Sequence, residues 1–227
     1  VRCLLPAQVP ACAGMFEPID IIAEKGSVLN AVYPAAVAAG NVETSSRVVD
    51  LVLGALVEVL PEVVSAASQG SMNNVAMGGH STRFGYWDYY ETLCGGHGAH
   101  AKGNGLSARH SHMTNTLNTP VESLESHYPL RIEAYALRSG SGGRGLNSGG
   151  DGVIRHYRFL APATLTLLTE RRQLAPWGVL GGASAAKGVN RINGHVVPGK
   201  YTASVAAGDL LVIETPGGGG FGKEIPD

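Results

Sequence analysis

The sequence predicts an α+β protein with a mixed first region and a β-rich second region. One long helical pattern occupies residues 41–60, and alternating strand patterns dominate from residue 128 onward. Glycine accounts for 32 of the 227 residues and gathers in four stretches: 94–105, 138–152, 178–188 and 217–222. Tight turns or close backbone contacts are expected there. We therefore divide the chain into a mixed α/β region, residues 1–127, and a β-rich region, residues 128–227.

The helix has recognisable ends and an apolar body. Asn41 can cap its start, because a side-chain oxygen accepts hydrogen bonds from the free N–H groups of the first turn. Pro61 ends it, because proline disfavours helical geometry at the preceding residue. Residues 51–60 are almost all apolar, so we expect a helix that is buried on most sides.

The strands are predicted from alternation of apolar and polar residues, which places one face of a strand on a core. Two earlier segments, 66–80 and 84–96, have weaker strand character. The clearer strands are 128–138, 152–160, 163–171 and a pair within 200–216. Ala161-Pro162 is a plausible hairpin turn, and Ala207-Gly208-Asp209 joins the last pair.

Composition excludes several classes of protein. The net charge is −1 without a long basic run, so no nucleic-acid partner is expected. Arg47, Asp50 and Glu58 interrupt the apolar helix, so no membrane partner is expected either. Three widely spaced cysteines suit free thiols in a reducing compartment, which favours a cytoplasmic location. The chain opens without a signal peptide and in mid-pattern, so we expect it to be a fragment of a longer subunit.

The segment "GSGGRG", residues 140–145, satisfies the spacing of a dinucleotide-binding loop. It leads into another strand pattern instead of a helix, so the helix N-terminus that would bind a phosphate is missing. A glycine loop between two strands is the better interpretation. No Walker-type phosphate loop occurs, so this chain is not expected to bind ATP through one.

Cys94, His97 and His100 lie together in "TLCGGHGAH". A thiolate nucleophile needs a neighbouring base, which spacing alone does not establish, and a small apolar cysteine beside a loop is the simpler interpretation. The two histidines could form half of a metal site, but no second ligand pair has a recognised spacing.

The segment "RHSHMTNTLNTPVE", residues 109–122, is unusually polar. If residues 109–114 are extended, His110 and His112 point to the same face, where they could share a metal ion or act as bases. Asn115 and Asn118 carry both donors and acceptors suited to an amide or a carboxylate. A well-hydrogen-bonded structural loop explains the composition equally well.

Two adjacent arginines follow a predicted strand in "TERRQLAPWG". Arg171 and Arg172 are expected on opposite faces, where one could pair with Glu170 and the other could reach an anion or a partner chain. A purely structural ion pair is the alternative. The four glycines of "ETPGGGGFG", residues 214–222, favour a backbone that passes close to another part of the protein.

Ten blocks in this order resemble the carboxy-terminal part of the hydantoinase B / 5-oxoprolinase family, including the N-methylhydantoinase B-type subunit. They are "GNVETSSRVVDLVLGAL", "AASQGSMNN", "YYETLCGG", "HSHMTNTLNTPVESLE", "YPLRIEAYALR", "SGSGGRG", "GGDGVIR", "LTERR", "PWGVLGG" and "TPGGGGFG". The resemblance covers nearly the whole chain. It implies part of the B-type subunit of an ATP-dependent hydrolase that opens hydantoin, 5-oxoproline or a similar small cyclic amide.

The same resemblance implies partners and cofactors. An A-type subunit would bind ATP, and the remaining part of the B-type subunit would bind a divalent metal ion through Asp/His-rich segments that this chain lacks. By itself the chain is therefore expected to be incomplete as an enzyme. Two alternatives stay open: a non-catalytic structural or assembly module of the complex, and a subunit of a related ketone carboxylase.

The resemblance also selects site residues. His112, Asn115 and Asn118 lie in its signature segment and are expected to be catalytic, with Glu91 and Glu122 as further catalytic candidates. The expected substrate-binding residues are Arg171, Arg172 and His110. The metal ligands stay unassigned.

Overall fold

A computed structural model describes residues 5–224, and it separates the chain into two compact units, residues 1–41 and 42–227. Within the first unit the described chain is mostly irregular. It contains a short 3-10 helix, Ala13–Phe16, and a turn in which the N–H of Gly26 donates to the carbonyl of Asn30 over 2.8 Å. None of its described residues is buried.

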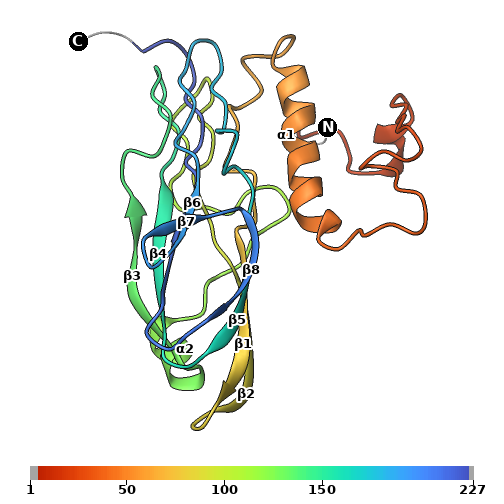
Figure 1. Cartoon of the computed structure of the whole chain (residues 1–227). Helices are drawn as coiled ribbons and strands as arrows, with labels where there is room; N and C mark the ends of the chain where they lie inside the picture. The colour runs from red at the N-terminus through yellow and green to blue at the C-terminus, as the bar shows by residue number, and fades with distance from the viewer. Residues whose placement is uncertain (1–4, 225–227) are drawn as a thin grey trace. The chain divides into compact units, whose positions relative to one another are not determined.

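The second unit contains two antiparallel sheets that face each other (Figure 1). Four strands form the first sheet in the order β2-β1-β5-β8: β2 (Gly85–Thr92), β1 (Asn74–Ser81), β5 (Ala163–Leu168) and β8 (Lys200–Val205). Five form the second sheet in the order β3-β4-β9-β6-β7: β3 (Leu130–Arg138), β4 (Gly152–Phe159), β9 (Leu210–Glu214), β6 (Val189–Ile192) and β7 (His195–Val197). The predicted α+β class is confirmed, with strands predominating.

The core lies between the sheets and follows from the alternation in the sequence. In β5, Leu165 and Leu167 are fully enclosed, and in β4, Tyr157 and Phe159 face them from the second sheet. Side chains of this size each contribute roughly 1.5–3 kcal/mol when they leave water. Helix α2 (Val121–His127) adds Leu124 to the same core.

The turn at Ala161-Pro162 is a correction to the sequence prediction. It does not close a hairpin, because β4 and β5 belong to different sheets, and the turn at Gly208 likewise carries the chain from β8 in one sheet to β9 in the other. Alternation indicates that a strand has one buried face, but it does not indicate which sheet the strand joins. A true hairpin, β6–β7, was not predicted, although Asn193-Gly194 is a strong turn signal and both residues have positive φ.

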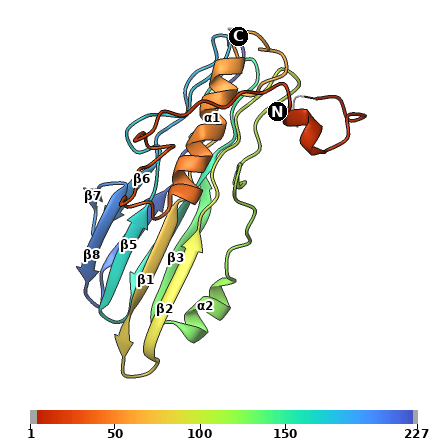
Figure 2. The ribbon, with the colours of Figure 1, turned by 90° about the vertical axis from the view of Figure 1, so that its right-hand side faces the viewer.

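The helical region begins at Gly40 with a π-helical turn (Gly40–Thr44) and continues as α1 (Ser45–Leu56), which runs beside the strands of the first sheet (Figure 2). It differs from the expected buried helix. Its buried α1 side chains are the polar Ser46 and Asp50, whereas Leu51 is 67% exposed. Ion pairs draw Asp50 inward, and an apolar run does not indicate which side of a helix its neighbours cover.

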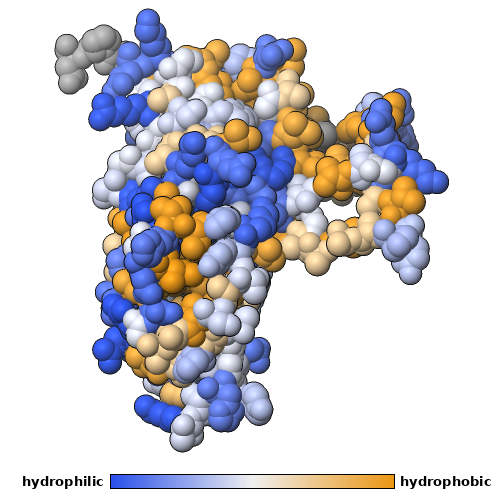
Figure 3. Space-filling model, viewed as in Figure 1, coloured by the Kyte–Doolittle hydropathy of each residue, from blue (hydrophilic) through white to orange (hydrophobic). Residues whose placement is uncertain are grey.

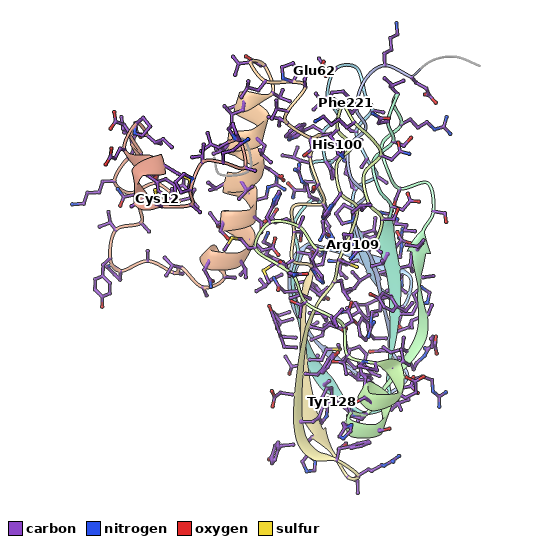
Figure 4. All side chains as sticks on the ribbon, turned by 180° about the vertical axis from the view of Figure 1, so that it is seen from behind. Cys12, Glu62, His100, Arg109, Tyr128 and Phe221 are labelled. Carbon is purple, nitrogen blue, oxygen red and sulfur yellow. The ribbon has the colours of Figure 1, made fainter. Side chains whose placement is uncertain are left out.

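The four glycine stretches meet in a layer of irregular backbone beyond the sheets, where Figure 4 labels His100 and Phe221. The N–H of Gly150 donates to the carbonyl of His97, and the N–H of Gly218 donates to the carbonyl of Gly150, each over 2.9 Å. A Cβ on Gly218 would lie 1.9 Å from the carbonyl oxygen of His97, so the close approach requires glycine. The predicted glycine loop of residues 140–145 is part of this layer and joins β3 to β4.

None of the helices between residues 5 and 224 has both the length and the apolar character that a membrane span needs. Cys12 and Cys94 are free thiols, as predicted, and Cys3 lies outside the described residues.

Candidate functional site

The segment 109–118 turns sharply and is not extended. His112 has a φ of 57°, and the N–H of Thr114 donates to the carbonyl of Ser111 over 3.3 Å. The expectation that His110 and His112 share a face is therefore wrong, because the alternation of side chains applies only to extended backbone. The two imidazoles face different surroundings, which define two neighbouring polar sites.

We call the first of these sites the His110 pocket. It has a volume of about 380 Å³ and is lined by Cys94, Ala108, Arg109, His110, Asn115, Thr116, Leu117, Asn118 and Tyr135. Three of the predicted site residues, His110, Asn115 and Asn118, thus line one cavity. Arg109 lies on the irregular segment between the glycine layer and the far end of the sheets, where Tyr128 is found (Figure 4).

Asn118 is held rigidly in the wall of this pocket. Its amide nitrogen donates to Oε1 of Glu91 and to the carbonyl of Thr92, both over 2.8 Å. Its amide oxygen accepts from the Tyr135 hydroxyl over 2.7 Å. Both amide protons are therefore used within the protein, and the group that Asn118 directs is the Tyr135 hydroxyl, whose oxygen keeps lone pairs free to accept.

Glu91 lies behind Asn118 in a buried charge pair. Its Oε1 is 3.2 Å from Nη2 of Arg155, whose side chain is 0% exposed, and its Oε2 accepts a short hydrogen bond from the Tyr157 hydroxyl. The Arg155 guanidinium also stacks on the ring of Tyr135, 4.4 Å from its centroid. We call Glu91, Arg155, Tyr157 and Asn118 the Glu91 cluster.

Arg155, Tyr135 and Tyr157 were not among the predicted site residues. A signal was available for Arg155, because it occupies an inward position of β4, between Val153 and Tyr157, where a cation needs a buried partner. No comparable signal marks Tyr135. It stands near one edge of the second sheet, and its role depends on Asn118, a residue of a distant loop.

His110 has its ring nitrogens enclosed, and neither makes a hydrogen bond of normal geometry within the described chain. Burial lowers the pKa of His110, an effect that the backbone of Thr116 only partly offsets. The imidazole is therefore neutral at pH 7 and can accept a proton. Burial raises the pKa of Tyr135 to about 12, so its phenol stays protonated.

His112 belongs to the second site, which surrounds Asp50 of α1. Its Nε2 is 2.7 Å from Oδ1 of Asp50, while Oδ2 of Asp50 is 2.6 Å from Arg47 and 2.7 Å from Arg171. Burial opposes ionisation of Asp50, but His112 and the two guanidiniums outweigh it and lower its pKa. We call Asp50, Arg47, Arg171 and His112 the Asp50 cluster.

Arg171 and Arg172 do not lie on opposite faces of a strand, because β5 ends at Leu168 and Arg171 has a φ of 60°. Both line one open pocket of about 450 Å³, which we call the arginine pocket. Its lining residues are Arg47, Thr169, Glu170, Arg171, Arg172, Gln173, Leu174, Pro198, Gly199 and Lys200. Glu170 pairs with Lys200, and not with an arginine side chain.

The remaining candidates are not drawn into these sites. Glu122 is exposed in the first turn of α2 and is not part of the His110 pocket. Burial raises the pKa of the Cys94 thiol, which disfavours a thiolate nucleophile. His97 bonds to the carbonyl of His110 over 2.7 Å, and the Nδ1 of His100 accepts from the N–H of Lys102.

A divalent metal ion does not fit the part of the chain that the structure describes. Between residues 5 and 224 no three side chains of His, Cys, Asp or Glu come together as possible ligands. The charged groups that do meet are arginine–carboxylate pairs, in which the guanidinium occupies the position that a cation would take.

Comparison with known proteins gives consistent matches over the whole chain. A family model described as hydantoinase B/oxoprolinase matches residues 1–224. The 5-oxoprolinase 1 of Arabidopsis thaliana is 42% identical over 230 residues, which cover 99% of this chain and 17% of the plant protein. A protein of Pseudomonas sp. (strain NS671), named as the B-type chain of a "Putative D-/L-hydantoinase", is 34% identical over 223 residues, which cover 95% of this chain and 37% of that protein.

A solved structure shares the fold. The ATP-dependent caprolactamase from Pseudomonas jessenii superimposes with a TM-score of 0.62 and 26% sequence identity, covering 74% of this chain and 32% of the caprolactamase chain. The chain thus spans less than half the length of each of these relatives.

Proposed function

The chain belongs to the hydantoinase B/oxoprolinase family, and we propose that it forms part of the B-type subunit of an ATP-dependent cyclic-amide hydrolase. The His110 pocket is the proposed substrate site. One observation carries the proposal: a neutral histidine whose ring nitrogens have no regular hydrogen bond lines a small cavity beside an oriented tyrosine hydroxyl. The names of the relatives, a 5-oxoprolinase, a hydantoinase and a caprolactamase, support a cyclic amide as the substrate.

The lining groups suit the hydrolysis of an amide. A ring amide offers one N–H donor and one C=O acceptor, and the oxygen of Tyr135 can accept the first while the exposed amide of Asn115 can donate to the second. Water must lose a proton as its oxygen bonds to the ring carbon, and the neutral imidazole of His110 can accept that proton. The Glu91 cluster has a positioning role, because it fixes Asn118 and, through it, Tyr135.

Two further components complete the proposed enzyme. ATP would be bound by an A-type partner, in keeping with the ATP dependence named for the caprolactamase and the B-type designation of the Pseudomonas hydantoinase relative. A divalent metal ion would be bound by the remaining part of the B-type subunit, because the described residues have no ligand set for it.

The test uses the complete assembly of A-type and B-type chains with hydantoin, 5-oxoproline or caprolactam and ATP. His110→Gln and Asn115→Ala are each expected to lower kcat by about tenfold to a hundredfold, the range for loss of a proton acceptor or an oriented hydrogen bond. Unfolding midpoints for Asn115→Ala should match wild type, because its side chain is exposed. Normal turnover by both variants would refute the assignment of the substrate site.

An assembly module is the second candidate. It is favoured by the observation that His110, His112 and Glu91 face three different surroundings instead of one cleft. It is also favoured by the exposed apolar side chains of Leu51 and Val59. Replacing these two residues with serine should separate the A-type and B-type chains in this case, while the His110 and Asn115 variants would leave turnover intact. Assay of the assembly with a ketone and bicarbonate tests the related carboxylase alternative.

A further inference from the structure

The arginine pocket gathers more positive charge than the protein neutralises. Four cations line it: Arg47, Arg171, Arg172 and Lys200. Two carboxylates pair with them directly, Asp50 with Arg47 and Arg171, and Glu170 with Lys200. Four charges against two leave an excess of two positive charges around a cavity of about 450 Å³.

Arg172 has only neutral hydrogen-bond partners. Its guanidinium donates to the amide oxygen of Asn190 over 2.7 Å and 3.2 Å, to the amide oxygen of Asn73 over 2.5 Å, and to the carbonyl of Glu170 over 2.8 Å. Within the described chain no carboxylate forms an ion pair with it. Four of its five N–H donors are thus used for orientation, and its charge is left without a partner.

The guanidinium of Arg172 is also packed into its place. A Cβ on Gly188 would come within 2.7 Å of it, so the backbone of Gly188 lies against the guanidinium group. Burial lowers the pKa of Arg172 to about 9, and the longer-range charge of Glu43 only partly offsets it. Burial also lowers the pKa values of Arg171 and Lys200. A cation without a counter-ion in a low-polarity surrounding is destabilised, and a bound anion would remove that penalty.

We propose that the arginine pocket binds a phosphoryl group. A phosphate dianion would neutralise both uncompensated charges, and guanidinium groups match its oxygens in geometry. Lys200, with a side chain that is 53% exposed, and Arg47, at 28%, stand where the pocket opens. Figure 3 shows hydrophilic side chains gathered on the face that carries β6, β7 and the start of β8. One carboxylate, that of Glu170, also lines the pocket and opposes the anion.

The Asp50 cluster connects this pocket to the segment that lines the proposed substrate site. Arg171 lines the arginine pocket and binds Oδ2 of Asp50, and His112 binds Oδ1 of the same carboxylate. His112 in turn follows His110 by two residues. An anion that pulls on Arg171 would therefore act on the segment that contains His110. Phosphoryl binding depends on the pocket alone and does not require the proposed function.

The phosphoryl group could belong to a nucleotide or to a phosphorylated small molecule. The experiment measures the unfolding midpoint and the calorimetric binding of wild-type protein with inorganic phosphate, ADP and ATP, at ionic strength matched with chloride. Saturable binding of phosphate is expected. Much tighter binding of ADP or ATP would identify the nucleotide as the source, and equal affinities would identify the small molecule.

Variants complete the test. Arg172→Gln should weaken phosphate binding by about tenfold or more, the loss expected for one charge-assisted hydrogen bond to a bound anion. Lys200→Gln, at an exposed position that folding does not require, should weaken it several-fold, so the test survives if Arg172→Gln fails to fold. Arg131→Gln, a matched change at an exposed position of β3, should leave binding unchanged.

Binding that does not saturate, that chloride reproduces, or that Arg172→Gln and Lys200→Gln leave unaltered would overturn the proposal. Failure here is distinguishable from failure of the proposed function. Phosphate binding probes the arginine pocket, whereas the ring-opening assays probe His110 and Asn115.

Discussion

The Glu91 cluster and the Asp50 cluster are both built on one buried carboxylate, yet they are balanced differently. Glu91 pairs with a single guanidinium, that of Arg155, and its other partners are the neutral Tyr157 and Asn118. Asp50 serves two guanidiniums and an imidazole at once. The first cluster is enclosed between the sheets, and the second borders an open pocket.

The difference separates two uses of buried charge. A balanced pair with all its partners inside the protein stabilises one geometry, here the orientation of Asn118 and Tyr135 beside the His110 pocket. A cluster with more cations than carboxylates is incomplete until an anion arrives. Variants of the two clusters should therefore differ in size and in dependence on pH and on anions.

Glu91→Ala is expected to have the largest effect. It leaves the guanidinium of Arg155, which is 0% exposed, without its carboxylate, and breaking a buried pair in this way costs about 3–5 kcal/mol of unfolding free energy. Urea unfolding measures the loss. The double variant with Arg155→Met should recover much of it, because the unpaired charge is removed as well.

A loss below about 1 kcal/mol for Glu91→Ala, or a double variant no more stable than the single one, would contradict the balanced-pair interpretation. Either result would mean that water or another chain already compensates Arg155.

Asp50→Asn is expected to cost less, about 2–3 kcal/mol near neutral pH, because the amide keeps part of the hydrogen bonding while its two arginines lose their counter-ion. The pKa of Asp50 is lowered in the folded state, so its contribution is fully present above the unfolded value near 3.8 and is lost as pH falls through the folded value. The stability difference between wild type and variant should shrink below about pH 4.

Glu43 provides the internal contrast. Burial raises its pKa, so its carboxylate opposes folding increasingly as pH rises above 4.5. Because Glu43 is present in both proteins, its effect cancels from the difference between wild type and Asp50→Asn. A difference that stayed constant from pH 7 to pH 3, measured by urea unfolding at each pH, would show that Asp50 is not stabilised as a carboxylate.

The sequence predicted the strands of the β-rich half well, because each has one face on the core. Tyr157 and Phe159 of β4 and Leu165 and Leu167 of β5 follow the alternation faithfully. The pairing of those strands was not accessible, because it depends on which sheet each strand enters after a turn. The short hairpin around Asn193 escaped because its strands have only four and three residues.

The candidate site was predictable only in part. His110, Asn115 and Asn118 lie close together in the sequence, so their polar segment could be recognised as one wall of a cavity. The partners that give them their chemistry come from elsewhere: Arg155 is 64 residues from Glu91, by the difference of their numbers, and Asp50 is 62 residues from His112. Ion pairs over such separations depend on the packing of whole sheets.

Tyr135→Phe should separate positioning from stability. The hydroxyl makes one hydrogen bond, to Asn118, at the edge of the Glu91 cluster, so its loss should cost only about 1 kcal/mol of unfolding free energy. In the complete assembly kcat for ring opening should fall about tenfold while KM for ATP stays unchanged. A fall in stability comparable to that of Glu91→Ala, or unchanged kcat, would remove Tyr135 from the substrate site.

Glu122→Gln is expected to have the smallest effect and provides the matched comparison for Glu91. Both are glutamates that the family resemblance selects, but Glu122 is exposed at the start of α2, whereas Glu91 is 5% exposed and paired with a guanidinium. An acidic residue in the first turn favours a helix only slightly, so the change should stay within about 0.5 kcal/mol. Turnover of the assembly should match wild type. A clear loss of kcat for Glu122→Gln with unchanged stability would mean that another chain brings α2 into the active site, and the comparison of the two clusters would then have to include a third carboxylate.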